Sequence, residues 1–475
     1  MKNINGQQLG VFDNTIDLVA NNPSPNATST DRRLIHHLGI TTAFDENHWS
    51  VPRLDRRRGV HSLFQYPGRM VPEVQQTLVH AVKDVKPSTR TVLDPYMGSA
   101  TSLVASMYSG LECYGQDINP LAILIGRVKT TFFDFAALTD SVQRVYWRAT
   151  QDLSEEIEVD FKGRNKWFRE DVAIRLSRLR RAIMLEESLS HRRVLWLVLA
   201  ETIRLTSNDR TSTYKLHARP IDVSESRIIN VCTVFQEHGI RTMNDLITFR
   251  DDLERNGQIA NNVYRARVVV DFVNSTEKIL ETADKQKFDL LVTSPPYGDN
   301  RTTIPYGEHA YLPLQWINLE DIDPKVAAVR DWLLTTNGID RNSMGGIFAQ
   351  RDPELIEELR EASPTLREHL AALASAESVL RRKVIAFYDD FYRSLKLIAT
   401  DLKPDAYLIW TLGNRRVNKM EIRNDAILQE FMGSLGCDYV TKLERIIHSK
   451  RMPHKNSSGK TMANEQILIL RKNGG

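Results

Sequence analysis

The chain has 475 residues, of which 26% are charged, and its formal net charge at pH 7 is only +3. This length exceeds what one compact core accommodates, so two or three structural units are expected. The small net charge excludes a uniformly basic nucleic-acid-binding protein, so any basic surface must be local. No apolar run approaches the roughly 20 residues that span a bilayer, and the amino terminus lacks a signal-peptide core. We therefore expect a cytoplasmic protein without a membrane partner.

Residues 1–60 are expected to form a polar N-terminal arm. The segment contains the polar run 21–26 (NNPSPN) and a basic set made up of Arg53, Arg56, Arg57 and Arg58. Such arginines suit contacts with phosphate, but a solvated tail explains the same composition. Both interpretations stay open.

Two predicted strands between residues 91 and 117 enclose a turn of small residues. The first strand ends at Asp94 and runs into 95–101 (PYMGSAT) and a helix, and the second strand ends at Asp117. This order of strand, glycine turn, helix, strand and acid is typical of sites for the adenosine end of a cofactor. The turn lets the backbone approach closely, and the acid accepts hydrogen bonds from ribose hydroxyls. The structural alternative is a turn that merely joins a strand to a helix.

Residues 131–264 are predicted to form a helical insertion between the second and third strands. Val172, Leu176, Leu179 and Ile183 recur at helical spacing, and residues 194–203 are apolar enough for a buried helix. A simple crossover between parallel strands needs only about a dozen residues. We therefore expect the insertion to have a task of its own.

The polar and basic segment 207–220 lies inside this insertion and has no strong periodicity. Our functional interpretation is target recognition, with phosphates or base edges contacted by Arg210, Lys215, His217 and Arg219. The alternative is a helical subdomain that only buttresses the sheet, with its arginines on a solvated face.

An apolar strand at 288–292 (FDLLV) leads directly into 293–298 (TSPPYG). The carboxyl edge of an open α/β sheet is where ligands bind. There, Ser294 Oγ and the carbonyl of Pro295 would accept hydrogen bonds from an exocyclic amino group and free its lone pair for alkylation. Pro295 and Pro296 hold the backbone in place, and Tyr297 would stack on a base. A proline-rich strand exit with a packed tyrosine is the structural alternative.

The remainder of the chain returns to an α/β pattern. Residues 300–316 suit a loop that closes over the target, with four aromatic residues that either contact a displaced base or pack: Tyr306, His309, Tyr311 and Trp316. Residues 317–375 predict a second helical insertion. Helices are then expected at 384–402 and 425–435, and strands at 406–412, 439–448 and 466–470.

The three cysteines disfavour methylation of a base at a ring carbon. Cys113, Cys232 and Cys437 lie far apart and show no metal-ligand spacing, so we expect neither a metal site nor a disulfide framework. Methylation at carbon 5 of cytosine needs a thiolate nucleophile. In the enzymes that carry out this methylation, the nucleophilic cysteine typically follows a proline. No cysteine here follows a proline, which favours direct transfer to an amino nitrogen.

In their order, these motifs resemble those of the S-adenosylmethionine-dependent amino-methyltransferases that modify DNA, the N4-cytosine and N6-adenine type found in restriction–modification systems. Residues 94–101 (DPYMGSAT) correspond to the pattern D-P-F-x-G-x-G-T, and residues 294–297 (SPPY) to S/D/N-P-P-Y. Residues 64–73 (FQYPGRMVPE) look like the segment that encloses the methionine part of the cofactor. Two departures are Ala100 in place of a glycine, and Asn274-Ser275 where an Asp-Ser contact to adenine is often found.

The resemblance implies a Rossmann-like class I methyltransferase, an α/β fold with a mixed, mostly parallel sheet and a largely helical insertion. It covers 61–130 and 265–475, which would form one catalytic domain interrupted by 131–264 and, less extensively, by 317–375. The catalytic residues would be Ser294, Pro295, Pro296 and Tyr297. The implied cofactor is S-adenosylmethionine, without a metal, and its implied contacts are Tyr66, Pro67, Asp94, Tyr96, Gly98, Ser99, Thr101, Asp117, Ile118, Asn274 and Ser275.

The implied substrate is a base flipped out of duplex DNA, because a stacked and paired amino group cannot meet the methyl sulfonium in line. In the family, serine at the first position of the tetrapeptide is more typical of enzymes acting on cytosine N4 than on adenine N6. Adenine N6, an RNA amino group, a protein glutamine amide and a noncatalytic binding module stay open as alternatives. A cognate restriction endonuclease or a defence-system partner is also compatible with the resemblance.

Overall fold

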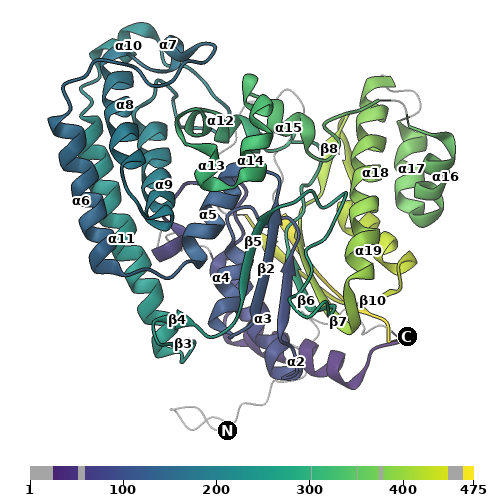
Figure 1. Cartoon of the computed structure of the whole chain (residues 1–475). Helices are drawn as coiled ribbons and strands as arrows, with labels where there is room; N and C mark the ends of the chain where they lie inside the picture. Colours follow the sequence, from purple (N-terminus) through teal and green to yellow (C-terminus); the bar gives the residue numbers. More distant parts are fainter. Residues whose placement is uncertain are drawn as a thin grey trace, which may run out of the picture.

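The computed structural model describes residues 25–51, 59–300, 302–349, 351–373, 378–447 and 464–474. A seven-stranded sheet with the order β10-β11-β7-β6-β1-β2-β5 forms its centre (Figure 1). The strands of this sheet are β1 (Thr91–Asp94), β2 (Glu112–Asp117), β5 (Val268–Phe272), β6 (Phe288–Thr293), β7 (Leu402–Leu412), β10 (Cys437–Ile446) and β11 (Asn464–Lys472).

The sheet is mixed and mostly parallel. Strand β1 pairs in parallel with both β2 and β6, with Leu93 opposite Tyr114 on one side and Leu291 on the other. The pairs β2–β5 and β6–β7 are also parallel, whereas β11 runs antiparallel to β7 and β10. The predicted fold class, a Rossmann-like methyltransferase fold, is confirmed by this arrangement. The chain moves outward from β1 through β2 to β5 and then returns to β6, so the strand order reverses between β1 and β6.

Alternating side chains of the sheet enter two separate cores. On one face, Val92, Leu290 and Ile409 are fully buried in a core shared with α2 (Ser29–Phe44), α3 (Pro72–Val85), α4 (Thr101–Tyr108) and α5 (Pro120–Thr130). On the other face, Leu93, Leu291 and Trp410 are buried against α18 (Ser378–Thr400) and α19 (Asn424–Ser434). Helices therefore cover both faces of the sheet, and the parallel strands are apolar on both sides.

The first insertion is helical, as predicted, and packs beside α5 (Figure 1). Its elements are α6 (Phe135–Gln151), α7 (Arg164–Trp167), α8 (Glu170–Met184), α9 (Leu189–Thr206), α10 (Ile221–Ser226), α11 (Val231–Arg255), β3 (Ile259–Ala260) and β4 (Val263–Tyr264). Residues 194–200 in α9 are buried, as the apolar run suggested. Two arginines of α8 pair with acids of the insertion itself, Arg180 with Glu158 at 3.0 Å and Arg181 with Asp152 at 2.8 Å. These two side chains stabilise the insertion.

The segment 300–316, expected as a loop, is largely helical. Its composition suggested a turn, but burial of apolar side chains overrides that tendency: Tyr311 and Trp316 are buried in α12 (Tyr306–Trp316), which packs against α9. The following segment is helical, as predicted. Its elements are α13 (Leu319–Ile322), α14 (Pro324–Ala328), η2 (Arg330–Leu334), α15 (Gly338–Asn342), α16 (Pro353–Ala362) and α17 (Pro364–Ala372).

Part of the expected N-terminal arm belongs to the folded domain. Helix α2 begins with a capping box between Thr28 and Asp31, and Leu34 and Leu38 on its inner face are buried. A short 3-10 turn, η1 (Gly59–His61), also lies in this region. The expectation of a wholly polar arm is therefore wrong for residues 29–44, because its apolar residues recur at helical spacing and have a core to enter. Residues 21–24 and the arginines at 53 and 56–58 lie outside the described residues.

A small hairpin of β8 (Arg415–Val417) and β9 (Met420–Ile422) follows β7. Within the described ranges, no helix is long and apolar enough to cross a membrane. The same ranges contain no group of three or more His, Cys, Asp or Glu side chains placed to hold a metal ion. All three cysteines are buried and unbridged.

Candidate active site

A cavity lies at the carboxyl ends of four parallel strands. The segments that directly follow β1, β2, β5 and β6 line it, and it contains about 870 Å³ of empty space, including the part open to solvent. The reversal of strand order between β1 and β6 falls at this point, and such reversals are where open α/β sheets bind ligands. The topology alone therefore makes this cavity the candidate site.

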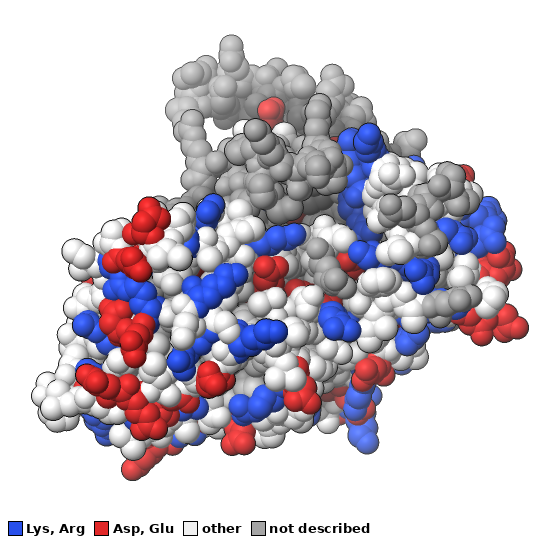
Figure 2. All heavy atoms as spheres, turned by 90° about the horizontal axis from the view of Figure 1, so that it is seen from above, with Lys and Arg blue, Asp and Glu red and all other residues white. Residues whose placement is uncertain are grey.

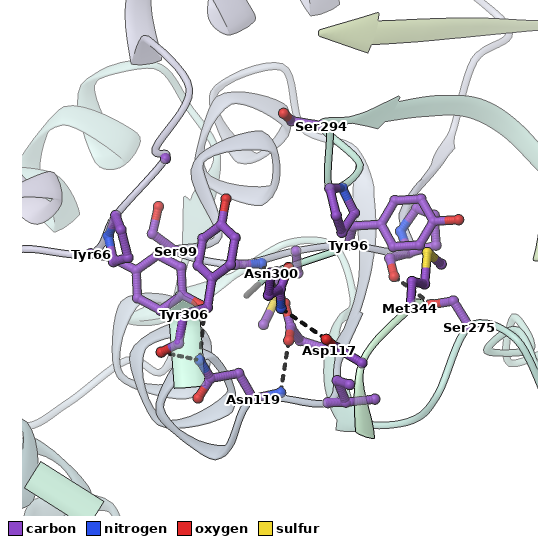
Figure 3. A pocket seen from close by; sticks show the side chains of 18 of the residues that line it. Tyr66, Tyr96, Ser99, Asp117, Asn119, Ser275, Ser294, Asn300, Tyr306 and Met344 are labelled. Atoms are coloured by element: carbon purple, nitrogen blue, oxygen red, sulfur yellow. Dashed lines mark hydrogen bonds between the residues drawn. The ribbon is translucent and has the colours of Figure 1, made fainter. Parts of the chain in front are cut away.

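Most of the predicted cofactor residues meet in this cavity (Figure 3). Those that line it are Tyr66, Pro67, Tyr96, Gly98, Ser99, Thr101, Asp117, Ile118, Asn274 and Ser275. They come from four separate segments of the chain. Ser275 is also fixed from behind, since its hydroxyl donates to the carbonyl of Pro95 and accepts from Gln116 Nε2 at 3.0 Å.

Asp94 is the exception, because it does not line the cavity. It is fully buried beneath the turn, where its carboxylate accepts hydrogen bonds from Ser102 Oγ, Thr293 Oγ1 and the backbone N–H of Tyr96. Burial raises the pKa of Asp94 to about 6, although these hydrogen bonds favour the ionised form. Its observed contacts tie β1 to β6 and to the turn, so the predicted lining role is corrected to a supporting one.

Asp117 lines the cavity and also holds the turn. Its carboxylate accepts from the backbone N–H of Gly98 and of Asn119, both at 2.8 Å. Burial raises the pKa of Asp117 above its ordinary value, and the amide hydrogen bonds oppose that rise. The carboxylate can accept further hydrogen bonds from a ligand, since its two oxygens offer about four acceptor positions.

The turn between β1 and α4 uses two left-handed residues. Gly98 has φ +49°, a conformation that side chains disfavour, and Ala100 has φ +59° at the N-cap of α4. The alanine stands where the related pattern has glycine. It is fully buried in the core and does not line the cavity, so its methyl group does not narrow the space for a ligand.

Two tyrosines form one wall of the cavity. The rings of Tyr66 and Tyr306 stack with centroids 5.8 Å apart, and Asn119 Nδ2 donates to Tyr66 Oη at 3.2 Å (Figure 3). Burial raises the pKa of both phenols above the ordinary value, so both are neutral at physiological pH. Contact with a displaced base and packing were both left open for Tyr306, and the structure places its ring in the cavity wall, stacked on Tyr66.

Sequence reasoning missed the contribution of the second insertion. Ile339, Ser343 and Met344 line the cavity, and so does Asn300. Asn300 Nδ2 donates to Ser343 Oγ at 3.0 Å, whereas its buried Oδ1 has no hydrogen-bond partner in the described structure. Buried amide oxygens are normally paired. Asn300 Oδ1 can therefore accept a hydrogen bond from a ligand in the cavity. No local pattern in the sequence predicts this role.

The tetrapeptide after β6 closes another side of the cavity. Ser294 and Pro296 line it, whereas Pro295 is buried and Tyr297 is not part of the lining. The backbone carbonyl of Tyr297 accepts from Asn424 Nδ2 at 3.0 Å, and its phenol lies 3.5 Å from Ser294 Oγ. Burial raises the pKa of Tyr297 well above its ordinary value. A polar group able to accept from an amine thus shares one cavity with the residues expected to hold a cofactor.

The predicted nucleic-acid contacts lie on a loop beside this cavity. An antiparallel bridge between Asp209 and Ala218 shapes the loop, in which Arg210, Lys215 and His217 are exposed and Arg219 is half-buried. The backbone N–H of Leu216 donates to Glu308 Oε1 at 3.0 Å, and Glu308 lies in α12. The loop is therefore anchored to the helix that begins with Tyr306, although its four predicted residues do not line the cavity themselves.

Charge is unevenly distributed over the face that Figure 2 shows, the one seen from above in the orientation of Figure 1. Figure 2 shows lysine and arginine side chains interspersed with neutral residues near the middle of this face, whereas acidic side chains are frequent toward its left and right edges. A protein that binds a nucleic acid needs positive charge only on the part of its surface along which the phosphate backbone of the nucleic acid runs. The small net charge of the chain is compatible with such a local distribution.

Comparisons with known proteins agree with the motifs. The chain is 28% identical over 458 residues to the type II methyltransferase M.MvaI of Kocuria varians, an alignment that covers 93% of this chain and 97% of the relative. It is also 32% identical over 87 residues to the type II methyltransferase M.MjaII of Methanocaldococcus jannaschii, covering 18% and 15% of the two chains. No family model matches. The resemblance to modification methyltransferases drawn from the motifs is confirmed.

Proposed function

We propose that this chain, a homologue of the type II methyltransferases, transfers a methyl group from S-adenosylmethionine to the exocyclic N4 amino group of a cytosine flipped out of duplex DNA. One observation carries the proposal: Ser294 of the tetrapeptide lines the same cavity as the turn Tyr96–Ser99 and Asp117. A side chain that would accept hydrogen bonds from an amine and an acid that would bind a ribose thereby share one cavity.

The cavity fits the cofactor by the chemistry of its lining. Asp117 would accept from the ribose hydroxyls, and the turn at Gly98 leaves the backbone open to close approach. Ile118, Asn274 and Ser275 would surround the adenine, and the unpaired Oδ1 of Asn300 offers an acceptor for a polar hydrogen of the cofactor. When bound, S-adenosylmethionine supplies an electrophilic methyl carbon on a sulfonium.

The tetrapeptide would prepare the nucleophile. The lone pair of an exocyclic amine is delocalised into the base, which makes the nitrogen a poor nucleophile. Ser294 Oγ and the carbonyl of Pro295 would accept from the two amino hydrogens, draw the nitrogen toward tetrahedral geometry and make the lone pair available. The remaining requirement is in-line alignment with the methyl group, which positioning in the cavity would provide.

The choice of cytosine rests on the residue at position 294. In the family that the motifs resemble, serine there is more typical of enzymes acting on cytosine N4, and aspartate or asparagine of enzymes acting on adenine N6. Ser294 lines the cavity together with Pro296, and of these two it is the one with a side-chain hydrogen-bond acceptor. N6-methyladenine as the only product would contradict this choice but retain the reaction type.

Duplex DNA would be gripped by the first insertion. Arg210, Lys215 and His217 are exposed on a loop anchored to α12, the helix that contributes Tyr306 to the cavity wall. A duplex contacted by this loop would lie close to the cavity, as a flipped base requires. Arg219 is half-buried and would contribute less to such a contact.

A transfer assay tests the proposal. The purified chain is incubated with S-adenosylmethionine labelled in the methyl group and, separately, with duplex DNA, RNA and a protein extract. We expect the duplex DNA to become labelled, and the RNA and the protein extract to take up much less label. Label only in RNA or only in protein would contradict the proposed substrate, and Ser294→Ala controls for transfer by contaminating enzymes.

A further inference from the structure

We propose that Glu465 is a positioning residue for the methyl transfer: it fixes the direction of the hydrogen bonds from Ser294 through Tyr297, so that the lone pairs of Ser294 Oγ face the amino group. The inference rests on the proposed function. Glu465 lies on β11, far along the chain from the tetrapeptide, and no part of the motif predicts it.

The contacts form a short chain of polar groups. Tyr297 Oη donates to Glu465 Oε1 at 3.2 Å, and Ser294 Oγ lies 3.5 Å from Tyr297 Oη. At its other end, Glu465 Oε2 pairs with Arg445 Nη1 on β10. Arg445 is buried, and its Nε donates to the carbonyl of Trp49 at 3.1 Å. The carboxylate is thus fixed from both sides.

The donors and acceptors that these groups offer set the direction of the hydrogen bonds between them. An arginine is always charged and only donates, so its partner Glu465 is held as an acceptor. A carboxylate cannot donate, so the phenol hydrogen of Tyr297 points to Glu465. The phenol oxygen can then only accept from Ser294, which places the serine hydrogen on the side of Tyr297. Both lone pairs of Ser294 Oγ are left for an amino hydrogen of the base.

Glu465→Gln would reverse this direction. Since Arg445 can only donate, the glutamine would present its carbonyl oxygen to Arg445 and its NH₂ group to Tyr297. The phenol oxygen would accept from that NH₂ group, and the phenol hydrogen would turn to Ser294. The serine hydrogen would then point toward the amino group of the base. Two donors would face each other, so Ser294 Oγ would accept less well from the amino hydrogens.

A double-mutant cycle tests this assignment. Single-turnover methyl transfer to duplex DNA is measured for the wild type, Glu465→Gln, Tyr297→Phe and the double variant. We expect Glu465→Gln to slow transfer by about 10- to 100-fold, less than the 10²–10³ typical of losing a preorganised polar contact outright. In the Tyr297→Phe background no phenol hydrogen remains to be reversed, so the same substitution should change the rate by less than about twofold.

Glu444→Gln is the matched control. Glu444 lies on β10 opposite Gln466, and within the described part of the chain its side chain accepts from Asn464 Nδ2 at 2.6 Å and from Gln466 Nε2 rather than from the tetrapeptide. Its substitution should leave the rate unchanged. Cofactor affinity, measured by calorimetry, should be equal in all variants within about twofold, because Glu465 does not line the cavity.

The outcomes separate the two claims. A wild-type rate in Glu465→Gln, or an equal loss whether or not Tyr297→Phe is also present, overturns the positioning role alone. Partial unfolding caused by Glu465→Gln would also give this second result, since a loss of folded protein would lower the rate equally with Tyr297 and with Phe at position 297. A wild-type chain that methylates no DNA overturns the proposed function and this inference with it.

Discussion

Asp117 Oδ2 accepts a hydrogen bond from the backbone N–H of Gly98 at 2.8 Å, so the acid that ends β2 holds the turn that follows β1. The same carboxylate lines the cavity. One side chain therefore shapes the turn that we propose to bind the cofactor and offers an acceptor to a ligand in the cavity, and its loss should affect both.

Asp117→Ala is expected to weaken the binding of S-adenosylmethionine. Each lost hydrogen bond to a charged acceptor should cost about 1.5–3 kcal/mol of binding free energy. Isothermal calorimetry on the folded variant measures this. Asp271→Ala is the control, because Asp271 lies on β5 and pairs with Lys325 at 2.6 Å outside the cavity. Unchanged affinity in Asp117→Ala would remove this residue from the cofactor site.

Replacing Arg210, Lys215 and Arg219 together with alanine should weaken DNA binding and reduce its salt dependence. Each lost phosphate contact lowers the slope of log K against log salt concentration by roughly 0.9. Binding is measured by fluorescence anisotropy across a salt series. Lys285→Ala with Lys287→Ala is the control, since both lysines are exposed next to the amino end of β6, opposite the cavity. A lower unfolding temperature with an unaltered salt slope would favour a purely supporting role of the loop.

Asp31→Ala should destabilise the whole domain. Asp31 on α2 and Arg471 on β11 form a buried pair at 3.1 Å, and Tyr407 Oη also donates to Asp31 at 2.7 Å. Removing one partner of a buried pair typically costs about 3–5 kcal/mol. We expect the lower end of this range, because Arg471 keeps its pairs with Asp405 and Asp438 at 3.2 Å. Chemical unfolding measures the loss, and Asp84→Ala on the half-exposed part of α3 serves as the control. A loss below about 0.5 kcal/mol, typical of surface sites, would contradict an integral role for α2.

The local features of the site were predictable from sequence because they are local patterns. The strands ending at Asp94 and Asp117, the turn between them and the tetrapeptide after β6 each follow from short runs of residues whose periodicity and turn chemistry are self-contained. Parallel strands then bring their carboxyl ends to one edge, which explains why Ser294, Gly98 and Asp117 meet.

The missed features depend on contacts between distant segments. Asn300 enters the cavity because Ser343 of the second insertion accepts from its side chain, and Glu465 reaches Tyr297 only once β11 has joined the sheet. Helix α12 forms where turn-forming residues predicted a loop, because Tyr311 and Trp316 have a core to enter. Asp94 looked like a lining residue, yet the burial of its carboxylate beneath the turn depends on Thr293 of β6.

Asp340 should make the stability of the fold depend on pH. Burial raises its pKa from 3.8 to about 6, although it accepts from the backbone N–H groups of Gly307 and Glu308 at the start of α12. Between about pH 4 and 6 the folded chain therefore holds this proton more tightly than the unfolded chain, and the contribution of Asp340 to the free energy of unfolding falls as pH rises.

Asp340→Asn removes this titration, so the comparison isolates it. The free energy of unfolding of the wild type minus that of the variant should be larger at about pH 4.5 than at about pH 7, by on the order of 1–3 kcal/mol, since one pKa unit corresponds to about 1.4 kcal/mol. Urea unfolding at both pH values measures it. A difference that does not change with pH would show that Asp340 does not titrate in this range.

The central claim is that Ser294 and the cavity around it methylate the N4 amino group of cytosine in duplex DNA. Its most direct test is mass spectrometry of the nucleosides from duplex DNA after a single turnover by the wild type and by Ser294→Ala. We predict N4-methylcytosine from the wild type, formed about 10²–10³ more slowly by the variant, with cofactor affinity unchanged. N4-methylcytosine formed at equal rates by both proteins, or a methyl group found on carbon 5 of cytosine, would contradict the account.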